Sequence, residues 1–171
     1  MDDLKALIRD VPNFPIPGII FKDITTLLKV PEGLKSVTDY LIDRYKDEQI
    51  DLVAAIESRG FMFGTPLAIA LGAGFIPIRK AGKLPADTIH REYALEYGTA
   101  RLELHRDAVQ AGQRVLIIDD VLATGGTAKA AVELVEELGG KVIGTAFVIE
   151  LSFLPGRATL AGTDVFSLVT Y

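Results

Sequence analysis

The sequence predicts one α/β domain in which a mainly parallel sheet is flanked on both faces by helices. Its 171 residues suit a single domain with a sizeable core. Short apolar segments alternate with segments of helical character along the chain, a pattern typical of parallel strands that are buried on both faces. In such sheets ligands bind at the carboxyl ends of the strands, so the loops that follow the strands are the first place to look for function.

The first part of the chain is predicted to form two helices separated by a proline-rich loop. A helix at about 2–9 precedes the loop at 11–25, where prolines oppose a regular helix. The second helix, at about 32–47, begins next to Pro31, and proline is favoured in the first turn of a helix. A buried strand at 51–56 follows.

The uncharged segment 60–78 reaches the length of a membrane span. Four residues that break helices interrupt it: Pro66, Gly72, Gly74 and Pro77. We therefore expect a helix at about 62–71, a glycine turn and a short strand at 75–78, with no membrane span.

The remaining elements continue the alternation. After the strand at 75–78, a polar loop is expected to run through about residue 98. Gly139 and Gly140 are expected to end the helix at 127–138. The predicted elements after the loop are a strand at 100–105, a strand at 115–118, a helix at 127–138, a strand at 142–149, a helical turn near 155–161 and a strand at 165–169.

Composition limits the possible functions. The net charge of −5 argues against a general nucleic-acid or membrane-surface binder, although a local basic cluster could still bind an anion. The absence of cysteine excludes disulfides, thiolate catalysis and cysteine-based zinc sites, and it is compatible with a reducing compartment. The sequence begins with the acidic stretch Met-Asp-Asp, which does not resemble a signal peptide. Together with the absence of cysteine, this start predicts a cytoplasmic protein.

The segment 115–138 combines a buried strand, two adjacent carboxylates, a glycine-rich turn and a helix. A glycine-rich turn at a helix N-terminus exposes backbone N–H groups to an anion such as a terminal phosphate. Asp119 and Asp120 would repel that phosphate, but as acceptors they suit sugar hydroxyls, hydrated Mg²⁺ or developing positive charge. A ligand with a phosphate and a nearby diol, such as a ribose 5-phosphate, satisfies both features.

Other interpretations of this segment are weaker. The Walker A pattern and the pattern G-x-G-x-x-G are both absent, which disfavours a nucleotide-hydrolysing P-loop and a dinucleotide fold. Taken alone, the acids could also form a turn or cap and the glycines a tight connection.

The same segment resembles the 5-phosphoribosyl diphosphate (PRPP) loop of the type I phosphoribosyltransferases, and further stretches over nearly the whole chain resemble the adenine phosphoribosyltransferases. These stretches are 14–25, 57–64, 78–85, 95–108 and 148–157. Where Ala123 stands, members of the superfamily that use 6-oxopurines have an aspartate, so its absence fits adenine. The resemblance implies one phosphoribosyltransferase domain over 1–171, with an N-terminal hood at about 11–28 and a flexible lid loop at about 84–98.

The resemblance also implies a reaction: transfer of 5-phosphoribosyl from PRPP to N9 of adenine, giving AMP and diphosphate in purine salvage. Mg²⁺ would be the cofactor, held mainly by substrate and water with no direct protein ligand. The family forms homodimers, and the apolar run Phe61-Met62-Phe63 is expected at such an interface.

Site residues follow from the matching motifs. Catalytic roles are implied for Glu96, Tyr97, Arg59, Asp119 and Asp120. The phosphate loop would be Ala123, Thr124, Gly125, Gly126 and Thr127. Diphosphate binding is implied for Glu57, Ser58, Arg59, Gly60, Arg79, Lys80 and Lys83, with a cis peptide between Glu57 and Ser58. Adenine binding is implied for Ile20, Phe21, Lys22 and Leu151, with backbone groups of Ile20 and Lys22 reading the base edge.

Two rival functions remain to be distinguished. Another phosphoribosyltransferase, for xanthine or a pyrimidine, is disfavoured by Ala123. A non-catalytic PRPP sensor, like the purine repressors that share this fold, would need a DNA-binding module, for which this chain has neither spare length nor a basic helix.

Overall fold

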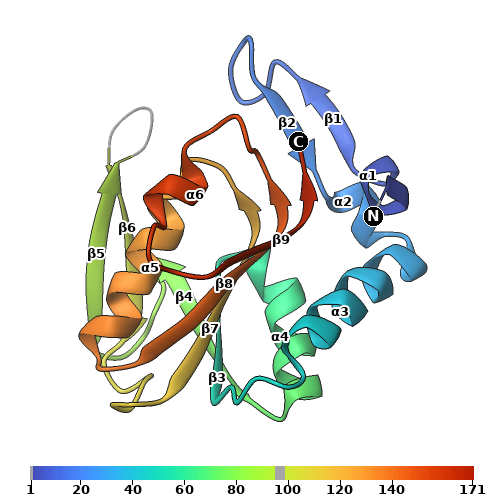
Figure 1. Ribbon diagram of the computed structural model, residues 1–171. Coiled ribbons are helices and arrows are strands. Elements are labelled where there is room, and N and C mark those ends of the chain that lie inside the picture. Colours follow the sequence, from blue (N-terminus) through green and yellow to red (C-terminus); the bar gives the residue numbers. More distant parts are fainter. Residues whose placement is uncertain (1, 95–98) are drawn as a thin grey trace.

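The computed structural model describes residues 2–94 and 99–171, which form a seven-stranded sheet with helices on both faces and a separate two-stranded hairpin (Figure 1). The sheet order is β5-β6-β4-β3-β7-β8-β9. Its strands are β3 (Leu52–Ile56), β4 (Gly74–Lys80), β5 (Thr88–Ala94), β6 (Thr99–His105), β7 (Arg114–Leu122), β8 (Lys141–Glu150) and β9 (Val165–Thr170). The strands from β4 to β9 in this order pair in parallel, and β6 and β5 add an antiparallel edge. The predicted mainly parallel sheet is confirmed.

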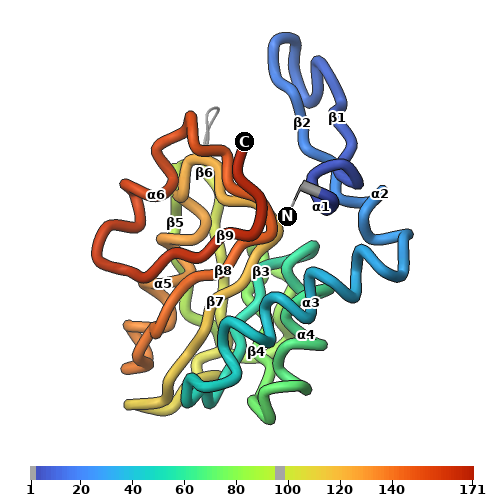
Figure 2. The backbone as a smooth tube through the Cα atoms, turned by 45° about the vertical axis from the view of Figure 1, so that its right-hand side comes forward, coloured from blue at the N-terminus to red at the C-terminus, as the bar shows by residue number. Residues whose placement is uncertain are grey.

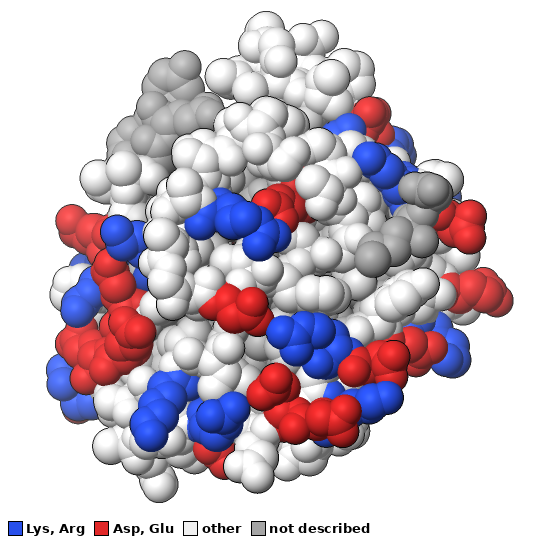
Figure 3. Space-filling view, in the orientation of Figure 1, with Lys and Arg blue, Asp and Glu red and all other residues white. Residues whose placement is uncertain are grey.

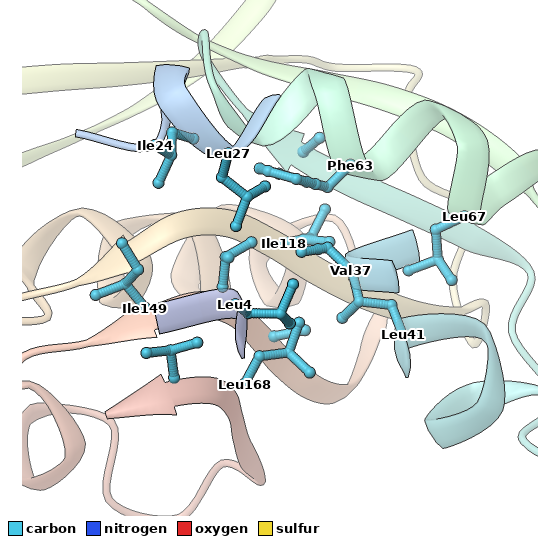
Figure 4. Close-up of a cluster of buried hydrophobic side chains, with 14 of the residues drawn as sticks. Leu4, Ile24, Leu27, Val37, Leu41, Phe63, Leu67, Ile118, Ile149 and Leu168 are labelled. Carbon is cyan, nitrogen blue, oxygen red and sulfur yellow. The ribbon is translucent and has the colours of Figure 1, made fainter. Parts of the chain in front are cut away.

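Two apolar layers hold helices against this sheet. Alternate residues of β7 point to opposite faces, as the two-residue period of a strand requires: Leu116 and Ile118 join one cluster, and Val115 and Ile117 join the other. The first cluster packs against α3 (Pro31–Tyr45) and α4 (Gly60–Leu71), and the second against α5 (Gly126–Glu137). Figure 4 shows the first cluster, in which Val37, Phe63 and Ile118 meet.

The N-terminal segment differs from the prediction. Helix α1 ends at Ala6 (Asp2–Ala6), and the expected loop contains a hairpin of β1 (Arg9–Pro12) and β2 (Ile20–Asp23), followed by the short helix α2 (Thr25–Leu28). In its turn, Gly18 has φ +91° and its N–H donates to Asn13 Oδ1 at 3.0 Å. The prolines hide this hairpin in the sequence, because the pairing of Val11 with Phe21 depends on residues ten apart. Figure 2 shows the hairpin standing apart from the main sheet.

The expected polar loop through residue 98 is also wrong in part, because residues 88–94 form strand β5. They pair antiparallel with β6, from Thr88 opposite His105 to Ala94 opposite Thr99. Only Ile89 is buried along this edge strand, so its sequence has the polarity of a loop. The lid predicted at 84–98 is therefore mostly a strand in its described part.

Smaller shifts occur at other boundaries. Strand β7 continues four residues beyond its predicted end at 118, so Asp119 and Asp120 lie within the strand. Helix α4 ends at Leu71, and Gly72 caps it in the left-handed conformation at φ +66° and separates the helix from β4. The predicted helix, glycine turn and strand are confirmed, although Pro66 lies inside α4 and Gly74 and Pro77 lie inside β4, so that of the four predicted breakers Gly72 separates the elements. None of the helices in 2–94 and 99–171 has the length and apolar character to cross a bilayer.

Candidate active site

A cleft of about 930 Å³ lies where β3, β4, β7, β8 and β9 end. Parallel strands bring their carboxyl ends to one edge of the sheet, so the loops that follow them converge there. Residues of the hairpin β1–β2 line the opposite side. The structure brings together most of the predicted site residues as lining groups: Ile20, Phe21, Lys22, Glu57, Ser58, Arg59, Arg79, Lys80, Lys83, Asp119, Asp120, Ala123, Thr127 and Leu151.

The turn 123–127 joins β7 to α5 at the floor of this cleft. Gly125 caps α5 with φ +86°, a conformation that favours glycine, and among the described residues no side chain makes a capping hydrogen bond to this helix. The first N–H groups of α5 therefore remain available to an anion, and the helix dipole adds positive potential there. Ala123 and Thr127 line the cleft, Thr124 and Gly125 form the turn, and Gly126 is the first residue of α5.

The two acids at the end of β7 have different partners. Asp120 is buried and its carboxylate accepts a hydrogen bond from Nε of Arg59. Asp119 accepts from the backbone N–H of Asp120 at 2.8 Å. Burial raises the pKa of the Asp119 carboxyl well above its usual range, and the neighbouring charge of Asp120 raises that pKa further. A cationic ligand at this position would favour the ionised form.

The carboxylate of Glu57 accepts hydrogen bonds from three residues, two at the end of the neighbouring strand β4 and one in the loop that follows it. It accepts from Arg79 Nε at 3.0 Å, from the backbone N–H of Lys80 at 2.8 Å and from Lys83 Nζ at 2.6 Å. Burial by itself would raise the pKa of Glu57, but these hydrogen bonds, that of Lys83 first, lower the pKa. The charge of Glu57 thus holds Arg79, Lys80 and Lys83 together as a basic loop beside the acid pair, in a protein that is acidic overall.

Arg59 connects the loop after β3 with the hairpin. Its guanidinium carbon lies 5.7 Å from the ring centroid of Phe21 in β2, within range of a cation–π contact. Phe14 packs edge-to-face on the same ring at 5.3 Å. Basic and acidic side chains intersperse over the face drawn in Figure 3, whereas its upper part, over the turn between β1 and β2, is uncharged. An apolar cover of this kind suits a flat, uncharged ring.

Comparison with known proteins gives the family. Residues 23–157 match the phosphoribosyl transferase domain model. An adenine phosphoribosyltransferase of Solibacter usitatus is 60% identical over 100% of this chain and 99% of that protein. A crystal structure of adenine phosphoribosyltransferase from Thermoanaerobacter pseudethanolicus has a TM-score of 0.96 at 52% identity and covers 99% of both chains. The chain belongs to the adenine phosphoribosyltransferase family.

The family also includes the Saccharomyces cerevisiae adenine phosphoribosyltransferase, solved in complex with D-2,5-dideoxy-2,5-imino-altritol 1,6-bisphosphate and adenine. That structure is 42% identical with a TM-score of 0.91, and the match covers 98% of this chain and 97% of the yeast chain. The predicted type I phosphoribosyltransferase fold is therefore confirmed along the chain.

Of the predicted site residues, Glu96 and Tyr97 lie outside the described residues, and Gly60 is not among the residues that line the cleft. Gly60 is buried below the cleft, where a Cβ would approach the carbonyl oxygen of Ile118 to 2.8 Å. Glycine at this position lets the loop after β3 lie directly on β7. The peptide bond between Glu57 and Ser58 is cis, as the resemblance implied.

The structure adds lining residues that sequence reasoning missed. Tyr93 of β5 lies close to the turn 123–127, since a Cβ on Gly126 would be 3.6 Å from its ring. Tyr171 also lines the cleft, and the ammonium groups of Lys22 and Lys5 lie 3.8 and 4.3 Å from its ring centroid. Further lining residues are Gly18, Ile19, Ile56, Val121, Phe153 and Leu154. The aromatic residues of the stretch 84–98 were a signal that could have identified Tyr93, whereas no local motif marks Tyr171.

The described residues do not contain a group of three or more His, Asp or Glu side chains arranged to hold a metal ion. Mg²⁺ usually binds proteins through one or two carboxylates while substrate phosphates and water complete its shell. The pair of Asp119 and Asp120 beside an anion-binding turn fits an ion of that kind.

Proposed function

We propose that the protein transfers the 5-phosphoribosyl group of PRPP to N9 of adenine, releasing AMP and diphosphate. Membership of the adenine phosphoribosyltransferase family supports this reaction. The observation that carries it is the junction of β7 and α5, where an acid pair adjoins a turn with free helix N–H groups. A substrate with a terminal phosphate and a ribose diol could bind both parts of this junction, the phosphate at the helix N–H groups and the diol at the acid pair.

The phosphate and the ribose would be held by adjacent parts of the chain. Backbone N–H groups of 123–127 and the hydroxyl of Thr127 donate to the 5-phosphate. Asp119 and Asp120 accept from the 2′ and 3′ hydroxyls, which fixes the sugar for attack. As the bond from C1′ to diphosphate loosens, the ring gains oxocarbenium-like charge that these carboxylates stabilise.

The diphosphate would be held by the basic loop and by Arg59. Lys80 and Arg59 would donate to its oxygens, and the planar fork of arginine suits two oxygens at once. Arg79 and Lys83, anchored on Glu57, add positive charge beside them. Mg²⁺, held mainly by PRPP oxygens and water close to the acid pair, would neutralise charge on the leaving group.

Adenine would lie between the hairpin and the end of β8. Phe21 offers an aromatic face, Leu151 an apolar contact on the other side, and both line the cleft. Backbone groups of Ile20 and Lys22 would read N1 and the 6-amino group. Glu96 is proposed to handle the adenine proton, Tyr97 to shield the reacting sugar, and the segment 84–98 to exclude water from PRPP.

The test supplies PRPP, Mg²⁺ and one nucleobase at a time and follows diphosphate release. We expect turnover with adenine and little with hypoxanthine, guanine, xanthine or uracil, because Ala123 lines the cleft without a carboxylate for a 6-oxopurine. Equal use of hypoxanthine would refute this specificity. Binding of PRPP without turnover on any base would instead favour the alternative function, a non-catalytic PRPP sensor.

We also propose a homodimer in the cytoplasm. Met62 and Ile69 lie seven residues apart on α4, hence on one face of the helix, and are 41% and 76% exposed. Phe63, expected at the interface, is instead buried in the core and so cannot contribute. Light scattering of the purified protein tests the dimer, and Ile69→Lys is expected to weaken it, since burying an unpaired charge at an interface is costly.

A further inference from the structure

The short helix α6 (Gly156–Thr159) packs against the back of the turn 123–127. Thr159 donates a hydrogen bond from Oγ1 to the carbonyl oxygen of Thr124 at 2.8 Å. A Cβ on Gly125 would come within 2.7 Å of the carbonyl oxygen of Gly156, and a Cβ on Gly156 within 2.3 Å of that of Ala123. The two segments therefore touch backbone to backbone, and a shift of α6 moves the turn.

A four-residue helix has little stability of its own, so its position depends on what anchors it. Arg157 supplies the anchor. Its Nε and Nη2 donate to the two carboxylate oxygens of Glu150 at 2.9 and 2.6 Å, and its Nη1 donates to the carbonyl oxygen of Val165 at 3.0 Å. Bidentate pairing of this kind fixes orientation as well as distance.

Glu150 connects this anchor to the strand that carries the acids. It is the last residue of β8, it is 7% exposed, and it pairs in register with Leu122 at the end of β7. The next residue, Leu151, donates its N–H to the carbonyl oxygen of Leu122 at 2.9 Å. The turn 123–127 is thus held from β7 on one side and, through Arg157 and α6, from β8 and β9 on the other.

We propose that Arg157, seated on Glu150, is a positioning residue that keeps the backbone of 123–127 in the shape that binds the 5-phosphate. Arg157 does not line the cleft and is not a phosphate ligand itself. It acts through the contact of Thr159 and Gly156 with the turn. This role rests on the proposed function, which assigns the phosphate to this turn.

A purely structural role predicts a different pattern of effects. If Arg157 only stabilised the fold, its loss would lower the melting temperature and leave ligand affinities of the folded fraction unchanged. A positioning role predicts weaker binding of the phosphate that the turn is proposed to hold, with no change for diphosphate, whose proposed ligands lie in the loop after β3, at the end of β4 and in the loop that follows β4.

The experiment measures ribose 5-phosphate and diphosphate affinities by calorimetry for Arg157→Gln, Arg157→Lys and Thr159→Val. Arg157→Gln is expected to bind ribose 5-phosphate about tenfold more weakly, since several hydrogen bonds to a charged group are lost. Arg157→Lys should recover only part of this, because lysine lacks the bidentate fork. Thr159→Val keeps side-chain volume and removes the bond to Thr124, so it tests the same link if Arg157→Gln fails to fold.

Arg114→Gln is the matched control, because Arg114 lies at the amino end of β7, at the opposite edge of the sheet from the cleft, and pairs with Glu48 at 3.5 Å. It should leave both affinities unchanged. In steady-state assays Arg157→Gln should raise KM for PRPP and not KM for adenine. Unchanged ribose 5-phosphate affinity in the folded variants, or an equal loss for both probes, overturns the inference alone. Failure of the unmodified protein to bind ribose 5-phosphate would overturn the proposed function as well.

Discussion

Arg59, in the loop after β3, donates a hydrogen bond from Nε to the carboxylate of Asp120 in β7. The two residues are 61 positions apart in sequence, and the parallel pairing of β3 with β7 brings them together. This bond couples the proposed diphosphate loop to the acid pair that is proposed to bind the ribose. Burial opposes the charge of Arg59, yet Asp120 still raises the pKa of its guanidinium. The two charges therefore act as one unit.

Asp120→Asn is expected to cut turnover at least tenfold while the fold persists. The amide keeps the size of the side chain but removes the negative charge that would stabilise the cationic ribose and hold Arg59. Turnover with PRPP and adenine, together with circular dichroism, checks this. Asp39→Asn, on the exposed face of α3, is the control and should change neither. Near-normal activity in Asp120→Asn would mean that the acid is structural.

Asp119→Asn is expected to stabilise the ligand-free protein at neutral and higher pH while it impairs turnover. The pKa of Asp119 is raised by burial and by Asp120, so the folded protein retains a proton that the unfolded chain has released. As pH rises above the ordinary value of 3.8, the free energy of unfolding falls until the folded pKa is passed. Asparagine has no carboxyl proton to release, so the variant avoids this fall in the free energy of unfolding.

Thermal unfolding of both proteins across the pH range tests this sign. The melting temperatures should agree near pH 4 and separate near pH 8, with the variant higher. A variant that melts lower at every pH would show that the carboxylate of Asp119 is a net stabilising acceptor.

Lys80→Gln is expected to raise KM for PRPP more than Lys83→Gln does. Lys83 Nζ is paired with Glu57, whereas the exposed side chain of Lys80 makes no ion pair with any residue in the described ranges. Its ammonium group can therefore meet the diphosphate without first leaving a carboxylate. Loss of a hydrogen bond to a charged group costs about 1.5–3 kcal/mol, or roughly tenfold or more in affinity.

Initial rates at varied PRPP, and diphosphate inhibition constants, compare these two variants. Lys46→Gln is a control whose ammonium group pairs with Asp43 on α3, outside the cleft. The assignment of Lys80 fails if Lys83→Gln has the larger effect on both constants.

Tyr171→Leu is expected to raise KM for adenine about fivefold and leave KM for PRPP unchanged. The ring of Tyr171 receives the ammonium groups of Lys22 and Lys5, and so ties β2 and α1 to the end of β9. A cation–π contact contributes about 0.5–1 kcal/mol at an exposed site, and two are lost. Tyr171→Phe keeps the ring and should behave as the parent. Equal loss in both variants would assign the effect to the hydroxyl instead.

Several features were predictable from local sequence. The alternation of apolar and helical segments identified the parallel sheet, and 115–138 contained the whole strand, acid pair, turn and helix in one stretch. Such features depend on neighbours within a few positions, where periodicity and glycine placement carry the information. The hairpin β1–β2 and strand β5 escaped prediction, since each has little buried surface and is formed by pairing with residues distant in the sequence.

The sequence by itself determined the chemistry available: a glycine turn for an anion, carboxylates for a sugar, and basic residues for a second anion. The tertiary structure decided how these groups meet. It placed the half-buried Asp119 beside the buried Asp120, paired Arg59 with Asp120, gathered Arg79 and Lys83 on Glu57, and set the helix that carries Arg157 behind the turn 123–127. Charge interactions depend on distance and burial in three dimensions, which residues far apart in a chain acquire only when the sheet brings them together.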